Sequence, residues 1–223
     1  MTAIDPELLQ TTFVTIDFET LTPAGRRPEP TEVAAQARSL HADGTWTEVG
    51  RFEALIRPPD GVPVTSFDAN QTGITAAMLE RQEPAETVLG NLDKLLTRPP
   101  YVLVAQSATY EAGLLYDRAT ACPILARIPL IDTVRLARIA YPDLPRHRLD
   151  DLLRHLELPP PIGRHRAMPD VEATSEVFAR LLADGTAAGH WRTLRRLHEV
   201  GGIVPKAVRD DEEAAKPQQQ SLF

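Results

Sequence analysis

One apolar stretch near the start of the chain, TFVTIDFET (residues 12–20), carries two carboxylates where a buried strand is expected. Successive side chains of a strand point to opposite faces, so Asp17 and Glu19 share one face, about 7 Å apart along the backbone, while the alternating apolar residues line the other. Two neighbouring like charges raise each other's proton affinity unless a positive group lies between them, and a divalent cation is the usual solution. The alternative is a half-buried edge strand with a solvated face, which this stretch alone does not exclude.

Size and composition narrow the class of protein. The chain has 223 residues, enough for one α/β domain with an appendage, and its 43% of hydrophobic residues is ordinary for a globular protein. Its single cysteine, Cys122, excludes an internal disulfide framework and suits a reducing compartment. No apolar run approaches the ~20 residues of a membrane span, and the first ten residues are too short and acidic for a signal peptide. We therefore expect a soluble, cytoplasmic protein with no membrane contact.

The charge balance limits the mode of any nucleic-acid binding. The formal net charge of −7 argues against indiscriminate binding over the whole surface, which would favour a basic protein. An enzyme with acidic metal ligands and local basic patches is still allowed.

The order of elements predicts the fold class. Residues 12–20 and 31–58 read as three antiparallel strands, with a turn at HADG. Strands and helices then alternate: we expect strands at 101–106 and 129–133 and helices at 84–96, 107–119, 134–141, 147–158 and 169–185. This order predicts an α/β protein whose mixed sheet is antiparallel on one side and parallel on the other, with helices packed on its faces.

The composition changes after Val200. We divide the chain into a leader (1–10), a main domain (11–185), a helix packed on that domain (186–202) and a tail (203–223). The tail holds glycines, prolines, an acidic run and three glutamines with little apolar material, so we expect it to be disordered. In the preceding helix, Trp191 is expected to cover the core rather than stack on bases.

Further candidate site residues lie where an α/β sheet gathers functional groups. Glu111 is expected in the first turn of the helix after strand 101–106, and Asp170 in the first turn of the last long helix. Strand C-termini and the following helix N-termini converge on one crevice, so both can join Asp17 and Glu19 there. His165 precedes Asp170 by five residues. Taken singly, the acidic residues could merely complement helix dipoles, and the histidine could be a solvated loop residue.

Taken together and in order, the segments DFE, QSATYE and HRAMPD resemble the three motifs of the DnaQ-like (DEDDh) 3′–5′ exonucleases, such as exonuclease X and the polymerase III epsilon proofreading subunit. The resemblance covers about residues 11–185 and implies a ribonuclease H-like fold, with three antiparallel strands followed by parallel ones. It also implies two Mg²⁺ or Mn²⁺ ions, held by Asp17, Glu19, Glu111 and Asp170, with His165 taking a proton from the attacking water.

The second motif departs from the family pattern His-Asn-Ala-x-Phe-Asp. Here Gln106 replaces the histidine, Ser107 the asparagine, Tyr110 the phenylalanine and Glu111 the aspartate. The first three changes keep hydrogen-bonding capacity or the aromatic ring. The added methylene of Glu111 moves its carboxylate by about 1.5 Å, enough to affect the rate of a positioned reaction, although it could equally let the carboxylate reach a metal directly.

Two groups of residues are candidates for contacts with partners. Arg146, Arg148, Arg164 and Arg166 form local basic clusters that could hold phosphates, although solvated loop arginines are an equal alternative. The final residues QQSLF resemble the short bacterial sliding-clamp-binding motif, which implies docking of the polymerase processivity clamp through Gln219, Leu222 and Phe223.

Three functions fit these observations. The leading one is a metal-dependent 3′–5′ exonuclease that releases nucleoside monophosphates from DNA ends in repair or proofreading, tethered to the sliding clamp. A catalytically silent module that binds DNA and the clamp is the second, and the substitution at Glu111 is the feature that favours it. The third is an exoribonuclease of the same fold, which the active-site residues alone do not exclude.

Overall fold

The computed structural model of the chain describes residues 4–163 and 165–215. Its sheet has the order β3-β2-β1-β4-β5-β6. The strands are β1 (Thr12–Leu21), β2 (Glu29–Leu40), β3 (Trp46–Leu55), β4 (Tyr101–Ala105), β5 (Leu130–Asp132) and β6 (Gly202–Ile203). The first three form an antiparallel meander, β4 and β5 run parallel to β1, and β6 pairs antiparallel with β5. The predicted mixed α/β sheet is therefore confirmed, and β6 is an additional strand that the sequence did not indicate.

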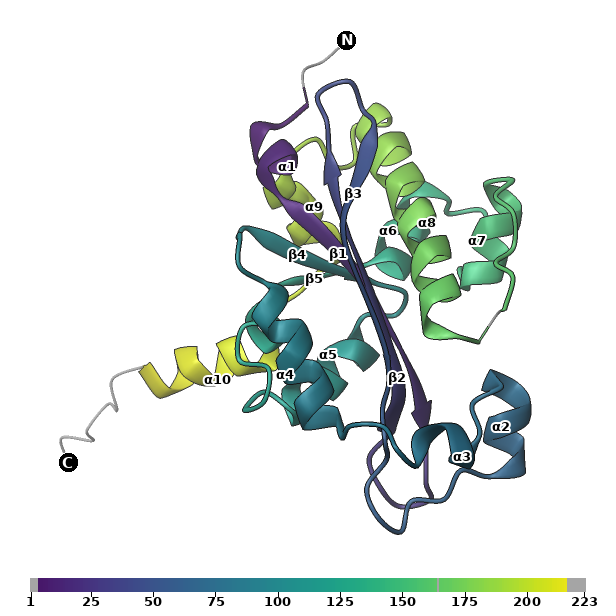
Figure 1. Cartoon of the computed structure of the whole chain (residues 1–223). Helices are drawn as coiled ribbons and strands as arrows, with labels where there is room; N and C mark the ends of the chain where they lie inside the picture. Colours follow the sequence, from purple (N-terminus) through teal and green to yellow (C-terminus); the bar gives the residue numbers. More distant parts are fainter. Residues whose placement is uncertain (1–3, 164, 216–223) are drawn as a thin grey trace, which may run out of the picture.

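Helices cover both faces of this sheet (Figure 1). The helices of the described chain are α1 (Pro6–Gln10), α2 (Ser66–Thr72), α3 (Ala76–Leu79), α4 (Ala85–Leu95), α5 (Thr109–Asp117), the 3-10 turn η1 (Leu125–Arg127), α6 (Thr133–Ala140), α7 (Leu149–His155), α8 (Ala167–Ala187), α9 (Leu194–Gly201) and α10 (Lys206–Ala215). Among the described residues, no helix combines the length and the hydropathy needed to cross a bilayer.

Two large hydrophobic clusters, one on each side of the sheet, form most of the core, and a small third cluster lies between β2 and α8. On one face, side chains of α4, α5 and η1 pack against Val14, Ile16 and Phe18 of β1. On the other, side chains of α6, α7, α8 and α9 pack against Phe13 of β1 and residues of β4 and β5. Trp191 belongs to this second cluster and is fully buried, as the sequence predicted.

The alternation of β1 places its carboxylates on the α8 side. Val14, Ile16 and Phe18 are buried on the opposite face, whereas Asp17 and Glu19 are half-buried. Strand periodicity therefore turns both acidic side chains toward the helix that carries Asp170.

The expected disordered tail is wrong for its first part. Residues 202–203 form β6, and Lys206–Ala215 form α10, which projects away from the body of the molecule in Figure 1. Three contacts hold the start of α10: Lys206 lies over the ring of Tyr116 at 4.1 Å, Asp210 accepts a hydrogen bond from the Tyr116 hydroxyl at 2.7 Å, and Asp211 pairs with Arg127 at 3.1 Å. The acidic run that indicated disorder thus forms one ion pair and one hydrogen bond with the domain.

Candidate active site

Strand β1 is longer than its neighbour β4, and the difference leaves one edge of β1 uncovered by β4 at the site. β1 pairs with β4 only from Thr12 to Thr15, yet it continues to Leu21. Its other edge stays paired with β2 along its whole length. Asp17 and Glu19 therefore lie on a strand that is supported on one side and extends beyond the end of β4 on the other.

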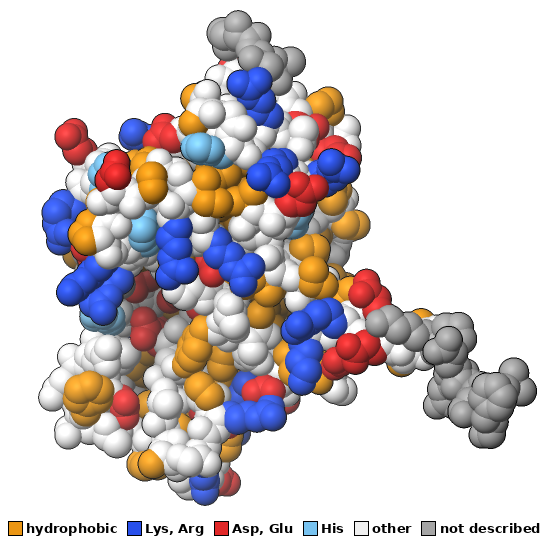
Figure 2. All heavy atoms as spheres, turned by 180° about the vertical axis from the view of Figure 1, so that it is seen from behind, with side chains coloured by type: hydrophobic (Ala, Val, Ile, Leu, Met, Phe, Trp, Pro, Cys, Tyr) orange, Lys and Arg blue, Asp and Glu red, His pale blue; other side chains and the backbone are white. Residues whose placement is uncertain are grey.

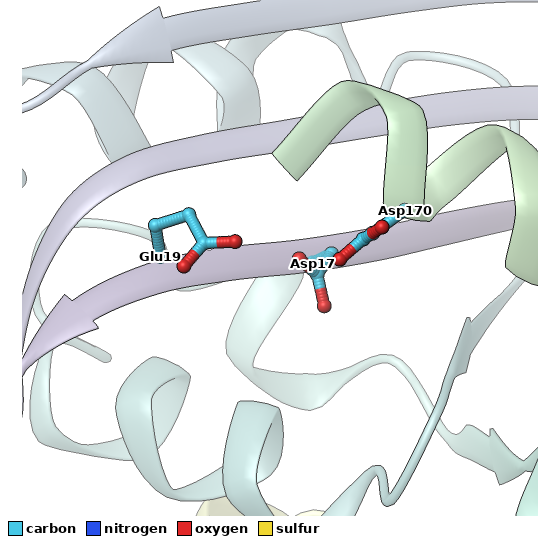
Figure 3. A group of neighbouring side chains, drawn as sticks. All are labelled: Asp17, Glu19 and Asp170. Atoms are coloured by element: carbon cyan, nitrogen blue, oxygen red, sulfur yellow. The ribbon is translucent and has the colours of Figure 1, made fainter. Parts of the chain in front are cut away.

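Three carboxylates meet beside this part of β1. Each of Asp17, Glu19 and Asp170 offers a carboxylate oxygen, and these three oxygens lie within 4.8 Å of one another. Figure 3 shows Asp17 and Glu19 on the strand and Asp170 on the neighbouring helix turn. The structure thus brings together three of the four carboxylates that the sequence selected.

Small side chains allow α8 to approach the sheet at this point. Ala34 lies opposite Asp17 in the β1–β2 register and is fully buried. It packs against Ala167, Met168 and Val171 in the first turns of α8. An alanine at this position lets the helix backbone lie close to the strand, which brings Asp170 within reach of the β1 carboxylates.

Glu111 lies outside the three-carboxylate group in the described part of the chain. It is on α5, as expected, but it is 4% exposed, and its Oε2 atom has no hydrogen-bond partner there. Burial raises the pKa of Glu111 to about 8, with a further contribution from the nearby Asp132 carboxylate and an opposing one from a backbone hydrogen bond. A metal role for Glu111 therefore stays a prediction.

His165 is exposed in the loop that leads into α8. Its backbone is left-handed (φ 65°), a conformation that is uncommon for residues other than glycine, although histidine is among those that adopt it more often. The loop thus presents the imidazole to solvent five residues before Asp170.

Gln106, which replaces the motif histidine, links the end of β4 to the start of α6 and to the loop before α7. Its amide nitrogen donates to the His147 carbonyl at 2.8 Å, and its carbonyl oxygen accepts from the Thr133 hydroxyl. Gln106 follows the last residue of β4, and Thr133 is the first residue of α6. The loop that carries the exposed Arg146 and Arg148 is therefore fixed at the C-terminal edge of the sheet.

Tyr110 connects the end of β1 to α5. Its hydroxyl group and that of Thr20 are 2.6 Å apart, and the Tyr110 side chain remains 41% exposed. A phenylalanine could not make this bond. Each of its two partners adjoins a candidate carboxylate, Glu19 or Glu111, so the bond couples the two segments that carry them.

Arg166, which the sequence suggested as a phosphate contact, pairs with a buried glutamate in the structure. Its guanidinium forms hydrogen bonds with both carboxylate oxygens of Glu32, a fully buried residue of β2. Sequence reasoning missed Glu32; the available signal was a lone acidic residue in the apolar run TEVAA. Arg164 and the residues of the clamp motif, Gln219, Leu222 and Phe223, lie outside the described residues.

Figure 2 shows a hollow on one face of the molecule and the charged side chains around it. Acidic groups lie inside the hollow, and Lys and Arg side chains gather on the surface beside it. A strand end with clustered carboxylates, next to a basic surface, is an arrangement compatible with enzymes that use divalent cations to act on phosphate esters.

The comparison with known families identifies the class more closely. Residues 14–178 match the family model RNase_T, described as "Exonuclease". The chain belongs to this exonuclease family, of the DnaQ-like type, and has the ribonuclease H-like fold.

Curated relatives are much longer proteins. The chain is 34% identical over 139 residues to the PolC-type DNA polymerase III of Halalkalibacterium halodurans, which covers 62% of this chain and 9% of the relative. It is 30% identical over 197 residues to that of Streptococcus suis, covering 87% of this chain and 13% of the relative. The chain thus spans about a tenth of the length of these polymerases.

Solved structures share the fold at low sequence identity. Exonuclease X in complex with 5′ overhanging duplex DNA aligns with a TM-score of 0.58 and 22% identity, over 84% of this chain and 98% of that one. The nuclease domain of 3'hExo, a DEDDh family member bound to rAMP, aligns with a TM-score of 0.62 and 21% identity, over 78% and 92%. E. coli exonuclease I in complex with a dT13 oligonucleotide has a TM-score of 0.65 at 18% identity, over 80% and 42%.

The donor set fits a hard divalent cation. The clustered ligand atoms are all carboxylate oxygens, which Mg²⁺ and Mn²⁺ prefer. The buried Oε2 of Glu111 has no hydrogen-bond partner among the described residues, and a cation-bound water would supply one. Asp17, Glu19 and Asp170 are therefore the residues suited to hold such an ion.

Proposed function

We propose that the chain is a metal-dependent 3′–5′ exonuclease that releases nucleoside monophosphates from DNA ends, in repair or proofreading. The observation that carries this proposal is the group of three carboxylates at the end of β1, in a chain of the exonuclease family. The DNA polymerases among its relatives favour DNA as the substrate. The neighbour bound to rAMP makes an exoribonuclease the second candidate.

The chemistry divides between bound cations and this chain's side chains. Two Mg²⁺ or Mn²⁺ ions would supply an acidified water and neutralise charge at the scissile phosphate. Asp17, Glu19 and Asp170 would hold them, and Glu111 would contribute directly or through a water. His165 would accept the proton of the attacking water, a role that suits a histidine on an exposed loop.

Substrate contacts and tethering extend the proposal beyond the carboxylates. Arg146 and Arg148 would hold phosphates near the crevice, because Gln106 fixes their loop at the edge of the sheet. Arg164 is proposed for the same role from its sequence position alone. Gln219, Leu222 and Phe223 would dock on the sliding clamp, which would raise the local concentration of the enzyme at DNA.

The experiment uses purified full-length protein with DNA and RNA oligonucleotides of the same sequence, labelled at the 3′ or 5′ end, with Mg²⁺ or Mn²⁺. We expect mononucleotide release from the 3′ end of DNA, and none from the folded variant Asp170→Asn. Faster release from RNA would favour the exoribonuclease. Absence of hydrolysis on both substrates, with retained DNA binding, would favour the silent module.

A further inference from the structure

Glu32 of β2 is a buried carboxylate beside the group of three carboxylates (Asp17, Glu19 and Asp170), yet it does not belong to that group. It lies opposite Glu19 in the β1–β2 register, so both side chains share the sheet face toward α8. Glu32 is 0% exposed. A carboxylate buried this deeply is costly unless it is paired and hydrogen-bonded, so its partners indicate its purpose.

Both partners of Glu32 lie at the start of α8. The Nε atom of Arg166 donates to the two carboxylate oxygens at 3.1 and 2.9 Å, and Nη2 donates to Oε1. The backbone nitrogen of Ala167 donates to Oε2 at 2.9 Å. Arg166 is the N-cap residue of α8 and makes no side-chain capping bond to its own helix. Glu32 therefore satisfies an amide that a helix N-terminus otherwise leaves without a partner, and it does so from a neighbouring strand.

In the Glu32–Arg166 contact, Arg166 lies in the chain between His165 and Asp170, the two candidate functional residues of the third motif. Arg166 directly follows His165, and its carbonyl accepts the hydrogen bond of the Asp170 backbone nitrogen at 3.3 Å. A shift of Arg166 would therefore move both the histidine loop and the helix turn that carries Asp170. A misplacement near 1 Å at a reacting centre can lower a rate about a hundredfold.

We propose that the Glu32–Arg166 ion pair is the positioning element that fixes the start of α8 on β2, and thereby holds Asp170 against Asp17 and Glu19 and sets the His165 loop. This inference rests on the proposed exonuclease function for its catalytic consequence. It replaces the sequence-based role of Arg166 as a phosphate contact. The guanidinium also offsets the charge of Glu32, so that a fourth uncompensated carboxylate does not adjoin the group of three.

Electrostatics support this assignment. The hydrogen bonds with Glu32 raise the pKa of Arg166 above its usual value, and the neighbouring charges of Glu53 and Glu19 act in the same direction. Arg166 is thus attracted to the acidic face of the sheet by three glutamates. An arginine held in this way contributes a planar, two-pronged contact that a lysine cannot reproduce.

The test compares Glu32→Gln and Arg166→Lys with the control Arg38→Gln. Arg38 also joins β2 to α8, through Ser175 at 3.0 Å and Glu176 at 2.8 Å, but beyond the first two turns of the helix. Three quantities are measured on full-length protein: kcat and KM on a 3′-labelled oligonucleotide, the midpoint of Mn²⁺ binding from the free-ion electron paramagnetic resonance signal, and the melting temperature.

We expect both test variants to lower kcat at least tenfold and to raise the Mn²⁺ midpoint at least threefold, with KM changed less than twofold, because outer partners of metal ligands commonly contribute 10- to 100-fold to affinity or activity. The control should keep kcat and the Mn²⁺ midpoint within twofold of the parent. A raised KM with unchanged kcat and Mn²⁺ binding would assign Arg166 to the substrate and overturn the inference. Parent values in both variants would also overturn it.

The measurements distinguish a failure of the proposed exonuclease function from a failure of the Glu32–Arg166 inference. If the parent protein releases no nucleotide, the exonuclease proposal fails, and the Mn²⁺ midpoint alone decides the present inference: a rise in the variants supports it and an unchanged value refutes it. If Glu32→Gln does not fold, Arg166→Lys, which keeps the positive charge, supplies the same comparison.

Discussion

Glu111 gives the sharpest physical prediction, because its carboxyl group is buried with one oxygen lacking a hydrogen-bond partner in the described chain. The perturbation is Glu111→Gln, which keeps the shape and removes the titrating proton. Burial raises the pKa of Glu111 from 4.5 to about 8. The neutral acid is therefore the form that the folded protein prefers, and ionisation opposes folding.

The sign and size of the change in unfolding free energy with pH follow from the difference between the pKa of Glu111 in the folded and in the unfolded protein. A carboxyl group whose pKa is higher in the folded than in the unfolded protein contributes stability below pH 4.5, and that stability is lost as the pH rises toward 8. At 1.36 kcal/mol per pH unit, the metal-free parent should lose about 3 kcal/mol of unfolding free energy, relative to Glu111→Gln, between pH 5 and pH 7.5.

The assay is urea denaturation in EDTA at both pH values, followed by circular dichroism. Groups that titrate in both proteins cancel in the difference. Glu86→Gln, an exposed glutamate in the first turn of α4, serves as the matched control and should follow the parent. Parallel pH profiles for the parent and Glu111→Gln, within about 1 kcal/mol, would refute the reasoning. Mg²⁺ at pH 7.5 should reduce the difference if a cation stabilises the ionised carboxylate.

Three further predictions concern catalysis, packing and the tail. His165→Ala should lower kcat about a hundredfold and leave the Mn²⁺ midpoint unchanged, as expected for a general base; an equal loss of metal affinity would make it a ligand. Gly185→Ala should destabilise the fold by about 1–3 kcal/mol or more in urea denaturation, because its Cβ would lie 2.0 Å from the Trp191 ring. Gly113→Ala in α5, whose Cβ meets nothing within 4 Å, is the control and should not destabilise. Deleting residues 219–223 should leave hydrolysis of short free oligonucleotides unchanged and reduce it only on clamp-loaded DNA; equal losses on both would contradict the tether.

The site could be predicted from the sequence as far as local periodicity carries information. Alternation along residues 12–20 placed Asp17 and Glu19 on one face. The helix expected to open on Pro169 placed Asp170 near a helix N-terminus, and in the structure that helix begins two residues earlier, at Ala167. The convergence of strand and helix ends in α/β folds then predicted that these groups meet. The structure brings these three together.

Other features were beyond the sequence because they depend on which surfaces come into contact. The acidic run after Val208 indicated disorder, since a segment poor in apolar residues cannot form its own core. Tyr116 and Arg127, far away in the sequence, supply the partners that hold α10. A partner on another element cannot be read from the composition of the segment itself.

The sequence by itself determined the alternating strand, the order of elements and three of the carboxylates, because these follow from side-chain periodicity within single segments. Only the tertiary structure decided that Glu111 is buried apart from the three clustered carboxylates, and that Arg166 pairs with Glu32. The physical reason is that the protonation and the pairing of a carboxylate depend on desolvation and on neighbouring charges, and both are fixed only when strands and helices from distant parts of the chain pack together.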